Sequence, residues 1–299
     1  MPGPGLSIIV VSYNSPATLE LCLESLASQL HLGKDEVIVA DCSDRDPRLG
    51  FRQQFPYFRF LRFDERLSIP KLRREGLKVA RAEIVAFTEG RLVPASGWAK
   101  ALLEAHAIHK DGPAVGGPID FAASSPFDAA VFFCEYGWHM PPTGDGEAEE
   151  LSGANLSYKR WALELCRDLI DAAAWEPFWH QRLKQHGHRL VRAGRALVCY
   201  HNSLSPSQFL RQRFHYGRWF AAARAEGSGF LRRLLYAAIC PLLPVLLTVR
   251  QARLVLKRRR HQRAFFAALP WIVPFYMVWS LGEFCGYLTG KGSSDRRAF

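Results

Sequence analysis

Polar side chains follow the first two short apolar runs of the chain. The first run ends at Ser12, Tyr13 and Asn14, and Asp41 ends the second. In an open sheet of parallel strands, ligands bind outside the carboxyl ends of the strands. A lone Asp after a strand is more often a turn or cap residue. Its pairing with the polar residues after the first run favours a binding site instead.

A carboxylate and a guanidinium follow a later apolar run. Glu89 and Arg91 are separated by one glycine, directly after residues 83–88. In this stretch only Glu89 can be a hard oxygen ligand for a divalent cation. Arg91 instead offers positive charge directly to an anionic group. The two residues leave both ways of binding a phosphorylated ligand open.

The spacing of apolar residues predicts the elements that must position these side chains. Short apolar runs predict strands at residues 6–12, 36–40, 58–63, 83–88 and 196–200. Helical spacing predicts helices at residues 17–30, 71–82, 98–109, 159–167 and 176–186. Residues 112–153 mix prolines, glycines and aromatics, which predicts long loops over a site. The β–α–β–α order predicts an α/β fold with a mostly parallel sheet flanked by helices.

The size and composition of the chain limit its class. The 299 residues are enough for one large domain plus a short appendage, and 48% hydrophobic residues exclude global disorder. A net charge of +11 suits an anionic partner: nucleic acid, a phosphorylated substrate or an acidic membrane surface. The 7 cysteines form no CxxC pair, and we interpret them as buried free thiols of a reducing compartment. The first residues show no pattern of a secretory signal.

The composition changes after about residue 229. Residues 234–249 and 265–281 are apolar and contain prolines, and the basic stretch 250–263 between them has no acidic residue. A pair of buried core helices with a solvated basic loop is the alternative, but the bulky aromatics suit a lipid interface. The sequence therefore predicts an α/β domain at 1–228 and a membrane-associated helical region at 229–299.

The topology of this helical region has two solutions. The first apolar segment gives about 24 Å of helix, which is short of a hydrocarbon core of about 30 Å. If it spanned, the basic linker would lie on the far side, against the positive-inside tendency. Helix-breaking prolines also lie in the middle of both segments. Re-entrant or interfacial hairpins fit these facts better than two transmembrane helices, and keep the basic flanks on the cytoplasmic, anionic leaflet.

Two runs at the start of the chain form a connected pattern, SIIVVSYNSPATLELCLESLASQ and EVIVADCSD. Together they resemble the opening of family 2 glycosyltransferases with the GT-A fold, and the resemblance extends to about His201. The stretches RFHYGRWFAAARA and WSLGEFCGYLTG resemble the tail of a bacterial subgroup with a C-terminal membrane attachment. The resemblance implies a GT-A-type, Rossmann-like sheet and an enzyme that uses a nucleotide-sugar donor.

The resemblance also implies which residues bind the donor. They are Ser12, Tyr13, Asn14, Asp41, Arg73, Glu89 and Arg91. Asp41 resembles the acid that accepts hydrogen bonds from the uracil imide and the ribose in the family. Arg73, in KLRREGLKVA, is similar to the Arg of the family's Arg-Asn-x-Gly helix start and would reach the diphosphate. An ordinary surface arginine is the alternative for Arg73.

The family typically ends its fourth strand with an Asp-x-Asp motif. Its carboxylates hold a divalent cation, Mg²⁺ or Mn²⁺, which neutralises the leaving nucleoside diphosphate. Here Glu89 and Arg91 stand in that motif, and this departure argues against a strict need for a cation. Glu89 and His201, in LVCYHN, are the metal ligands that the resemblance implies. A structural role for His201 is the alternative.

An inverting transfer is a single displacement in which a base removes the proton of the acceptor hydroxyl. The family's base belongs to a Glu-Asp pair at a helix start, after a Gly-rich acceptor loop. Here LSGANLSYKRW supplies the loop and AWEPFWHQRLKQHG the helix. The resemblance therefore implies Glu176 as the base, with Pro177 in place of the Asp. The alternative is that Glu176 only complements the helix dipole.

Acceptor contacts are expected from the loops over the site and from the residues before the apolar segments. The candidates are Glu135, Tyr136, Asn155, Arg211, Arg213 and Arg218. The arginines of FLRQRFHYGRW are placed to bind a lipid-linked phosphate at the interface. A solvated basic face that touches lipid headgroups is the alternative.

These expectations combine into an inverting glycosyltransferase at the cytoplasmic face of the inner membrane. Its acceptor would be lipid-linked or a cell-envelope polysaccharide, and anionic lipids would be partners. A degenerate GT-A protein that binds nucleotide-sugar or a partner without turnover is the alternative, because Glu89-Gly90-Arg91 and Pro177 depart from the family. Nucleic acid is not an expected partner, since the basic excess lies around the apolar segments and no nucleic-acid motif is present.

Overall fold

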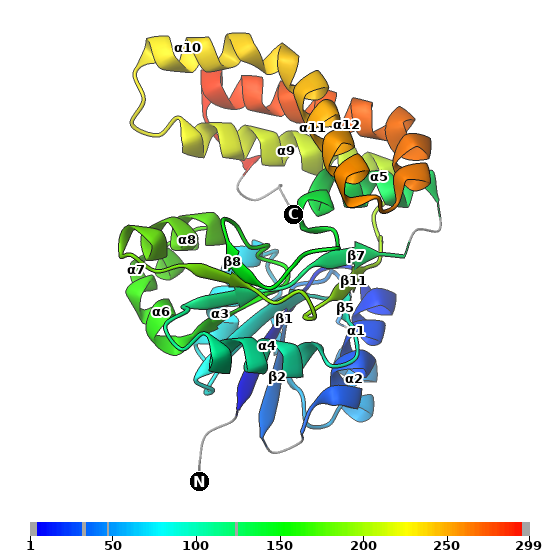
Figure 1. Cartoon of the computed structure of the whole chain (residues 1–299), viewed down its shortest axis with the longest axis vertical. Helices are drawn as coiled ribbons and strands as arrows, with labels where there is room; N and C mark the ends of the chain where they lie inside the picture. The colour runs from blue at the N-terminus through cyan, green and yellow to red at the C-terminus, as the bar shows by residue number, and fades with distance from the viewer. Residues whose placement is uncertain (1–4, 32–33, 47, 123–124, 295–299) are drawn as a thin grey trace. The chain divides into compact units, whose positions relative to one another are not determined.

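Figure 1 shows the computed structural model of the chain, which describes residues 5–31, 34–46, 48–122 and 125–294. The chain divides into two compact units. The first unit comprises Met1–Ala122 and His139–His201, and the second comprises Ala123–Trp138 and Asn202–Phe299. Every strand of the described residues belongs to the first unit.

Two sheets form the centre of the first unit. Their strands are β1 Leu6–Ser12, β2 Asp35–Asp41, β3 Arg59–Arg62, β4 Ile84–Glu89, β5 Leu92–Pro94, β6 Ala114–Gly116, β7 Ile119–Phe121, β8 Gly146–Ala148, β9 Leu156–Lys159, β10 Leu190–Arg192 and β11 Val198–Tyr200. The large sheet has the order β3-β2-β1-β4-β9-β6-β10-β8, and the small sheet has the order β5-β11-β7. Strands β3, β2, β1 and β4 are parallel, whereas β9 runs antiparallel between β4 and β6.

The parallel strands end at a common edge. Ser12 is in register with Asp41, and Val11 is in register with Glu89. Strand β1 is buried along its whole length, which explains its uninterrupted apolar sequence, since both faces of a parallel sheet are covered. The register therefore brings the polar ends of β1, β2 and β4 together.

Seven helices of the described residues belong to the first unit and flank its sheet (Figure 1). They are α1 Pro16–Gln29, α2 Arg48–Gln54, α3 Ile69–Leu77, α4 Trp98–Ile108, α6 Arg160–Leu165, α7 Arg167–Asp171 and α8 Glu176–Gln185. The predicted α/β class with a mostly parallel sheet is confirmed. Helix α3 ends at Leu77, before the predicted residue 82, and the N–H groups of Val79 and Ala80 both donate to the Gly76 carbonyl there.

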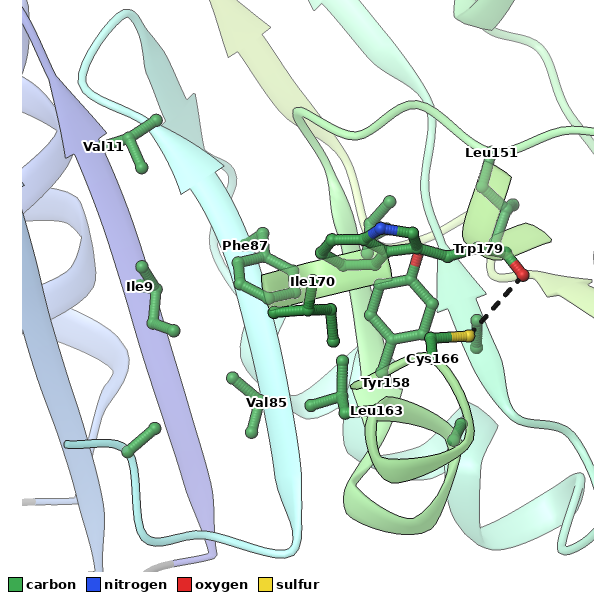
Figure 2. Packing of buried hydrophobic residues seen from close by; sticks show 14 of the residues in the cluster. Ile9, Val11, Val85, Phe87, Leu151, Tyr158, Leu163, Cys166, Ile170 and Trp179 are labelled. Atoms are coloured by element: carbon green, nitrogen blue, oxygen red, sulfur yellow. Dashed lines mark hydrogen bonds between the residues drawn. The ribbon is translucent and has the colours of Figure 1, made fainter. Parts of the chain in front are cut away.

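An aromatic core fixes α8 against the sheet (Figure 2). The ring of Phe87 on β4 lies 6.0 Å from that of Tyr158 on β9 and 6.1 Å from that of Trp179 on α8. The thiol of Cys166 donates to the Trp179 carbonyl at 3.8 Å. Because Phe87 and Trp179 are close in sequence to two acidic residues, Glu89 and Glu176, this packing sets the spacing of those acids.

The prediction of long loops across residues 112–153 was wrong in part. Strands β6, β7 and β8 lie there, together with α5 Pro126–Glu135 and the 3₁₀ helix η1 Gly137–His139. Helix α5 begins where Ser125 Oγ accepts from the Asp128 N–H at 3.1 Å, with Pro126 in its first turn. The short strands depend on partners far away in sequence, so no local pattern revealed them.

The second unit is helical. It contains α5 and also α9 Pro206–Arg224, α10 Phe230–Ile239, η2 Cys240–Leu242, α11 Leu243–Arg258 and α12 Gln262–Thr289. Helices α9 and α12 pack with their backbones in contact. A Cβ at Gly217 would collide with the Trp279 carbonyl oxygen, and one at Gly282 with that of Phe214. Glycines therefore permit a helix contact that a side chain would separate.

The prolines of the two apolar segments have different effects. Pro241 lies in η2, which separates α10 from α11, as the sequence predicted for the first segment. In the second segment, α12 continues through Pro270 and Pro274, so the predicted break there was wrong. Most of the predicted basic linker belongs to α11 and α12, and only residues 259–261 lie between these helices.

Two helical runs, Phe230–Arg258 and Gln262–Thr289, are long and apolar enough to cross a membrane. Only 11% and 33% of their most apolar stretches are buried, unlike the core helix of a soluble protein. Large apolar side chains are exposed on both runs, among them Phe230, Leu231, Leu242, Val245, Phe266 and Met277. This surface favours association with a membrane.

Candidate active site

The loops that follow β1 and β2 are bonded to each other. Asp41 is buried, and its carboxylate accepts from the N–H of Ser43 at 3.0 Å and from its Oγ at 2.7 Å. The Asn14 N–H donates to Ser43 Oγ at 2.8 Å. The Asn14 side chain exchanges two hydrogen bonds with Asp44, of 2.7 and 2.9 Å. Asn14 has φ 47°, which Asn tolerates better than most residues, so the motif holds two turns together.

Two arginines lie beside these turns. Arg62, at the end of β3, donates to Asp41 Oδ1 at 3.2 Å. The guanidinium of Arg66 lies 4.4 Å from the centroid of the Tyr13 ring. The hydroxyl of Ser12 is buried without a hydrogen-bond partner among the described residues. The structure thus brings the predicted residues of β1 and β2 together and adds cations that suit an anionic ligand.

Four charged side chains of alternating sign form a line in the first unit, which we call the charge line: Glu176, Arg73, Glu89 and Arg91. Arg73 of α3 is 1% exposed and donates through Nη1 to Glu176 Oε1, at the start of α8. Its Nη2 donates to Glu89 Oε1 at 3.3 Å. Glu89 Oε2 lies 3.6 Å from Arg91 Nη2. Arg73 therefore connects α3, β4 and α8.

The pKa values of Arg73 and of two buried neighbours, Tyr158 and His180, are shifted by their surroundings. Burial opposes the charge on Arg73, but Glu176 and Glu89 outweigh it and raise the pKa of this guanidinium. Burial, aided by Glu176, raises the pKa of Tyr158 well above its ordinary value. The Tyr158 hydroxyl is hydrogen-bonded to His180 Nε2 at 2.8 Å, and burial lowers the pKa of His180 to about 3. Both groups are neutral near pH 7.

Two glycines allow the backbone to approach this region closely. A Cβ on Gly153, in the predicted acceptor loop, would collide with Glu176 Oε2 and lie 2.9 Å from Arg73 Nη1. A Cβ on Gly90 would lie 3.4 Å from Ser12 Oγ. A side chain at 153 would therefore displace the carboxylate, which explains a glycine at this position.

The residues present do not fit a divalent-cation site of the Asp-x-Asp type. Both carboxylate oxygens of Glu89 face guanidinium groups. His201 donates its backbone N–H to the Arg91 carbonyl at 2.9 Å, and burial lowers the pKa of its imidazole. Within the described ranges, no group of three His, Cys, Asp or Glu side chains could hold a metal ion. Mg²⁺ and Mn²⁺ prefer several oxygen ligands, which one carboxylate paired with two arginines does not supply.

Asn155, predicted to contact the acceptor, is bonded within the fold. It is fully buried, and its Oδ1 accepts from Trp98 Nε1 at 2.8 Å. Its Nδ2 donates to the carbonyls of Pro118 and Ala196, at 2.9 and 2.8 Å. These bonds use the donors of the amide, so the side chain holds the loop that precedes β9.

The other predicted acceptor residues belong to the second unit. Glu135 of α5 accepts from Gln212 Nε2 at 2.8 Å and lies 4.0 Å from Arg213 Nη1. Arg213 is buried, and its guanidinium lies 4.1 Å from the centroid of the Trp279 ring. These side chains form a polar cluster between α5, α9 and α12.

Three further candidates differ in exposure. Tyr136 is buried at the end of α5. Arg218 donates to the Gly290 carbonyl at 2.9 Å and to Thr289 Oγ1 at 3.0 Å, so it caps the end of α12. Arg211 is exposed on α9. Of the three predicted arginines, Arg211 is the one presented to solvent.

Sequence reasoning missed several residues of the site. Arg62 could have been found, because it ends β3 in register with Asp41 and obeys the same rule of strand ends. Ser43 lies two residues after Asp41, the spacing of a local Asx turn. Tyr158 gave no signal, because its strand β9 was not predicted.

Comparison with known proteins gives a family match for part of the chain. Residues 7–132, from β1 into α5, match the family model for glycosyl transferase family 2. The uncharacterised protein MT1568 of Mycobacterium tuberculosis (strain CDC 1551 / Oshkosh) is 33% identical over 94 residues. That match covers 30% of this chain and 30% of the relative, so the chain matches less than a third of the relative's length.

A solved structure shares the fold. The crystal structure of GalNAc-T7 with UDP, GalNAc and Mn²⁺ has a TM-score of 0.53 and 15% identity, over 67% of this chain and 44% of that chain. The crystal structure of S. aureus TarS has a TM-score of 0.48 and 19% identity, over 70% of this chain and 38% of that chain. Residues 7–132 therefore resemble glycosyl transferase family 2, and the chain shares the fold of the GalNAc-T7 structure.

Proposed function

We propose that this chain transfers a sugar from a nucleotide-sugar to an acceptor hydroxyl, with inversion of configuration. The observation that carries the proposal is the charge line next to the joined turns after β1 and β2. A carboxylate can act as a base, guanidinium groups can stabilise a leaving diphosphate, and hydrogen-bonding turns can seat a nucleotide. This combination, in a family 2 domain, is what an inverting transfer requires.

The nucleotide of the donor binds at the turns after β1 and β2 in this proposal. Asp41, Asn14 and Ser43 form a preorganised set of hydrogen-bonding groups there. Ligands of open α/β sheets bind beyond the carboxyl ends of the strands. The structure of GalNAc-T7, which has the same fold, contains UDP. The diphosphate then lies toward Arg91, at the exposed end of the charge line.

The reaction is a single displacement. The acceptor oxygen attacks the anomeric carbon while the bond from this carbon to the diphosphate oxygen breaks. The acceptor proton moves to Glu176 Oε2, and the nucleoside diphosphate leaves with the electron pair of the broken bond. Arg73 donates to Glu176 Oε1 and thereby orients the carboxylate. The other oxygen lies against Gly153, in the loop expected to bind the acceptor.

A second candidate function is binding of a nucleotide-sugar or partner without turnover. It is favoured by Pro177, which replaces the family's second acid at the start of α8, and by the burial of Glu176. Hydrolysis and transfer assays with a donor that binds separate the two functions. Binding without release of nucleoside diphosphate, with any acceptor, favours the second.

Replacing Asp41 by Asn should weaken binding of the preferred nucleotide-sugar by about 10-fold to 100-fold, the scale of one hydrogen bond to a charged group. Thermal shift on the detergent-purified chain identifies the donor from a set of nucleotide-sugars, since a bound ligand stabilises the folded state. Calorimetry then gives the dissociation constants of the parent and the variant.

The matched control is Asp168→Asn, an exposed carboxylate of α7 that pairs with Arg182. It should leave donor affinity unchanged. Equal affinities of the parent and Asp41→Asn, at similar thermal stability, would remove Asp41 from the donor site.

The second unit attaches the chain to the cytoplasmic face of the inner membrane in this proposal. Helix α9, which packs along α12, carries Arg211, Arg213, Arg218 and Arg224. A charged side chain at the bilayer centre costs about 2.5–3.5 kcal/mol, so α12 with α9 at its side is poorly suited to cross. The apolar surface of α10 and α11 would instead lie in the leaflet, with the acceptor a lipid-linked or envelope saccharide.

Replacing Arg253 and Lys257 together by Gln should reduce binding to vesicles that contain anionic lipid by about 30-fold. Both side chains are exposed on α11, and each basic residue near an anionic surface contributes about 1 kcal/mol. Vesicle sedimentation at low and high salt measures the effect. A double change of Lys100 and Arg195, exposed in the first unit, alters the net charge equally and is the control. An equal loss of vesicle binding in both double variants would contradict a membrane-binding surface on α11.

A further inference from the structure

We propose that Arg91 replaces the divalent cation of the Asp-x-Asp motif, so that the chain binds the diphosphate of its donor without a metal ion. The inference rests on the proposed function and concerns the same site. It assigns to one guanidinium the charge stabilisation that relatives with two carboxylates obtain from a cation. The argument depends on the position of Arg91, on the charge of the site and on the partners of Glu89.

Contacts of both the backbone and the guanidinium hold Arg91 in position. Its backbone carbonyl accepts from the His201 N–H at 2.9 Å, at the junction of β5 with β11. Its guanidinium lies 3.6 Å from Glu89 Oε2 and 5.9 Å from the centroid of the Tyr200 ring. The side chain is 15% exposed, whereas that of Arg73 is 1% exposed. Arg91 is therefore the member of the charge line that a ligand can reach while its orientation is maintained.

The electrostatic balance of the site is the same as that of a loaded metal site. Two carboxylates and a divalent cation have no net charge. Glu89 and Arg91 also have no net charge, and neither do Glu176 and Arg73. A donor diphosphate therefore meets the same total charge in both arrangements. The difference is that a planar guanidinium offers two parallel N–H donors to phosphate oxygens, whereas a cation offers coordination sites.

The partners of Glu89 oppose capture of a cation. One of its oxygens lies 3.3 Å from Arg73 Nη2, and the other lies 3.6 Å from Arg91 Nη2. A divalent ion on either oxygen would face a guanidinium at close range. At a 4 Å separation, like unit charges repel by about 4 kcal/mol at an effective dielectric constant near 20, and a double charge repels more. One carboxylate does not offset two such repulsions.

The close packing of the 89–91 turn also favours a fixed guanidinium. The Gly90 N–H donates to the Val11 carbonyl at 2.9 Å, so the turn is bonded to β1. A Cβ on Gly90 would lie 3.2 Å from Leu19 Cδ1. The backbone therefore has little freedom to rearrange around an ion, while Arg91 needs no rearrangement to present its donors.

The experiment measures nucleotide binding rather than activity. Calorimetry on the full chain in detergent measures the binding of UDP, GDP, ADP and dTDP, first in EDTA and then with MnCl₂. The nucleotide that binds most tightly should have dissociation constants that agree within about twofold in the two conditions. Arg91→Gln should weaken its binding in EDTA by about 30-fold, the scale of a lost charge-assisted hydrogen bond. Arg91→Lys should recover part of that loss, and Arg195→Gln, an exposed control, should change nothing.

A second variant tests the same idea in the opposite direction. Arg91→Asp places two carboxylates, separated by Gly90, at the end of β4. This variant should bind Mn²⁺, read directly by electron paramagnetic resonance, and its nucleotide binding should require the metal. The parent chain should give only the spectrum of free Mn²⁺.

Three results would overturn the inference. Tight nucleotide binding by the parent that needs Mn²⁺ would do so while leaving the proposed function intact. Parental affinity of Arg91→Gln in EDTA would equally remove Arg91 from the diphosphate site. Failure of all four nucleotides to bind the parent, with and without metal, would overturn the proposed function together with the inference.

Discussion

Glu176→Gln is expected to lower turnover by about 100-fold to 10,000-fold, the usual contribution of a general base, while donor affinity stays close to that of the parent. The amide keeps the size of the side chain and an oxygen that can accept from Arg73 Nη1. It has no basic oxygen to take the acceptor proton. The measurement is the single-turnover transfer rate, determined alongside the dissociation constant of the donor.

The control is Glu75→Gln. This carboxylate of α3 pairs with Arg74 and Lys78 outside the charge line, so its loss should leave the rate unchanged. A parental rate for Glu176→Gln would mean that the base lies elsewhere. The anomeric configuration of the product, read by NMR, is an independent check, because retention would reject a single displacement.

Arg73→Met should lower the free energy of unfolding by about 3–5 kcal/mol, the cost of removing one partner from a buried ion pair. The side chains of Arg73 and Glu176 are 1% and 2% exposed. Met fills similar space but leaves Glu176 buried without its guanidinium partner. Glu89 also loses one of its two guanidinium neighbours. Urea unfolding of the full chain in detergent, followed by intrinsic fluorescence, measures the effect.

The neighbouring arginine provides the control. Arg74 is partly exposed and pairs with Glu75 at the surface, so Arg74→Met should cost about 1 kcal/mol or less. The double variant Arg73→Met/Glu176→Gln should be more stable than Arg73→Met alone, because it removes the uncompensated carboxylate. Equal losses at 73 and 74, or strict additivity in the double variant, would contradict a buried ion pair.

The strands that carry the donor side were predictable from the sequence. Strands β1, β2 and β4 are covered on both faces, so each is a nearly unbroken apolar run that can be recognised without knowledge of its partners. Because such strands align in parallel, their last residues fall at a common edge. This rule places Ser12 and Asp41 at one edge, and the family resemblance added Glu89.

The charge line was not predictable in the same way. Arg73 and Glu176 are 103 positions apart, and nothing local in either segment indicates the other. Their pairing depends on β9, which lies between β4 and β6 and is only four residues long. Helix α9 was also missed, although Ser205 and Gln208 form a capping box at its start. Its many arginines concealed it, since they suggested a basic surface stretch.

The glycine contacts between α9 and α12 have a mechanical consequence. Gly217, Gly282 and Gly286 each meet a carbonyl of the opposite helix, so neither helix can slide or roll without moving the other. At a bilayer surface, α12 would tilt with the thickness and lateral pressure of the leaflet. Helix α9 would tilt together with α12. The positions of its basic side chains would therefore depend on the thickness and lateral pressure of the leaflet.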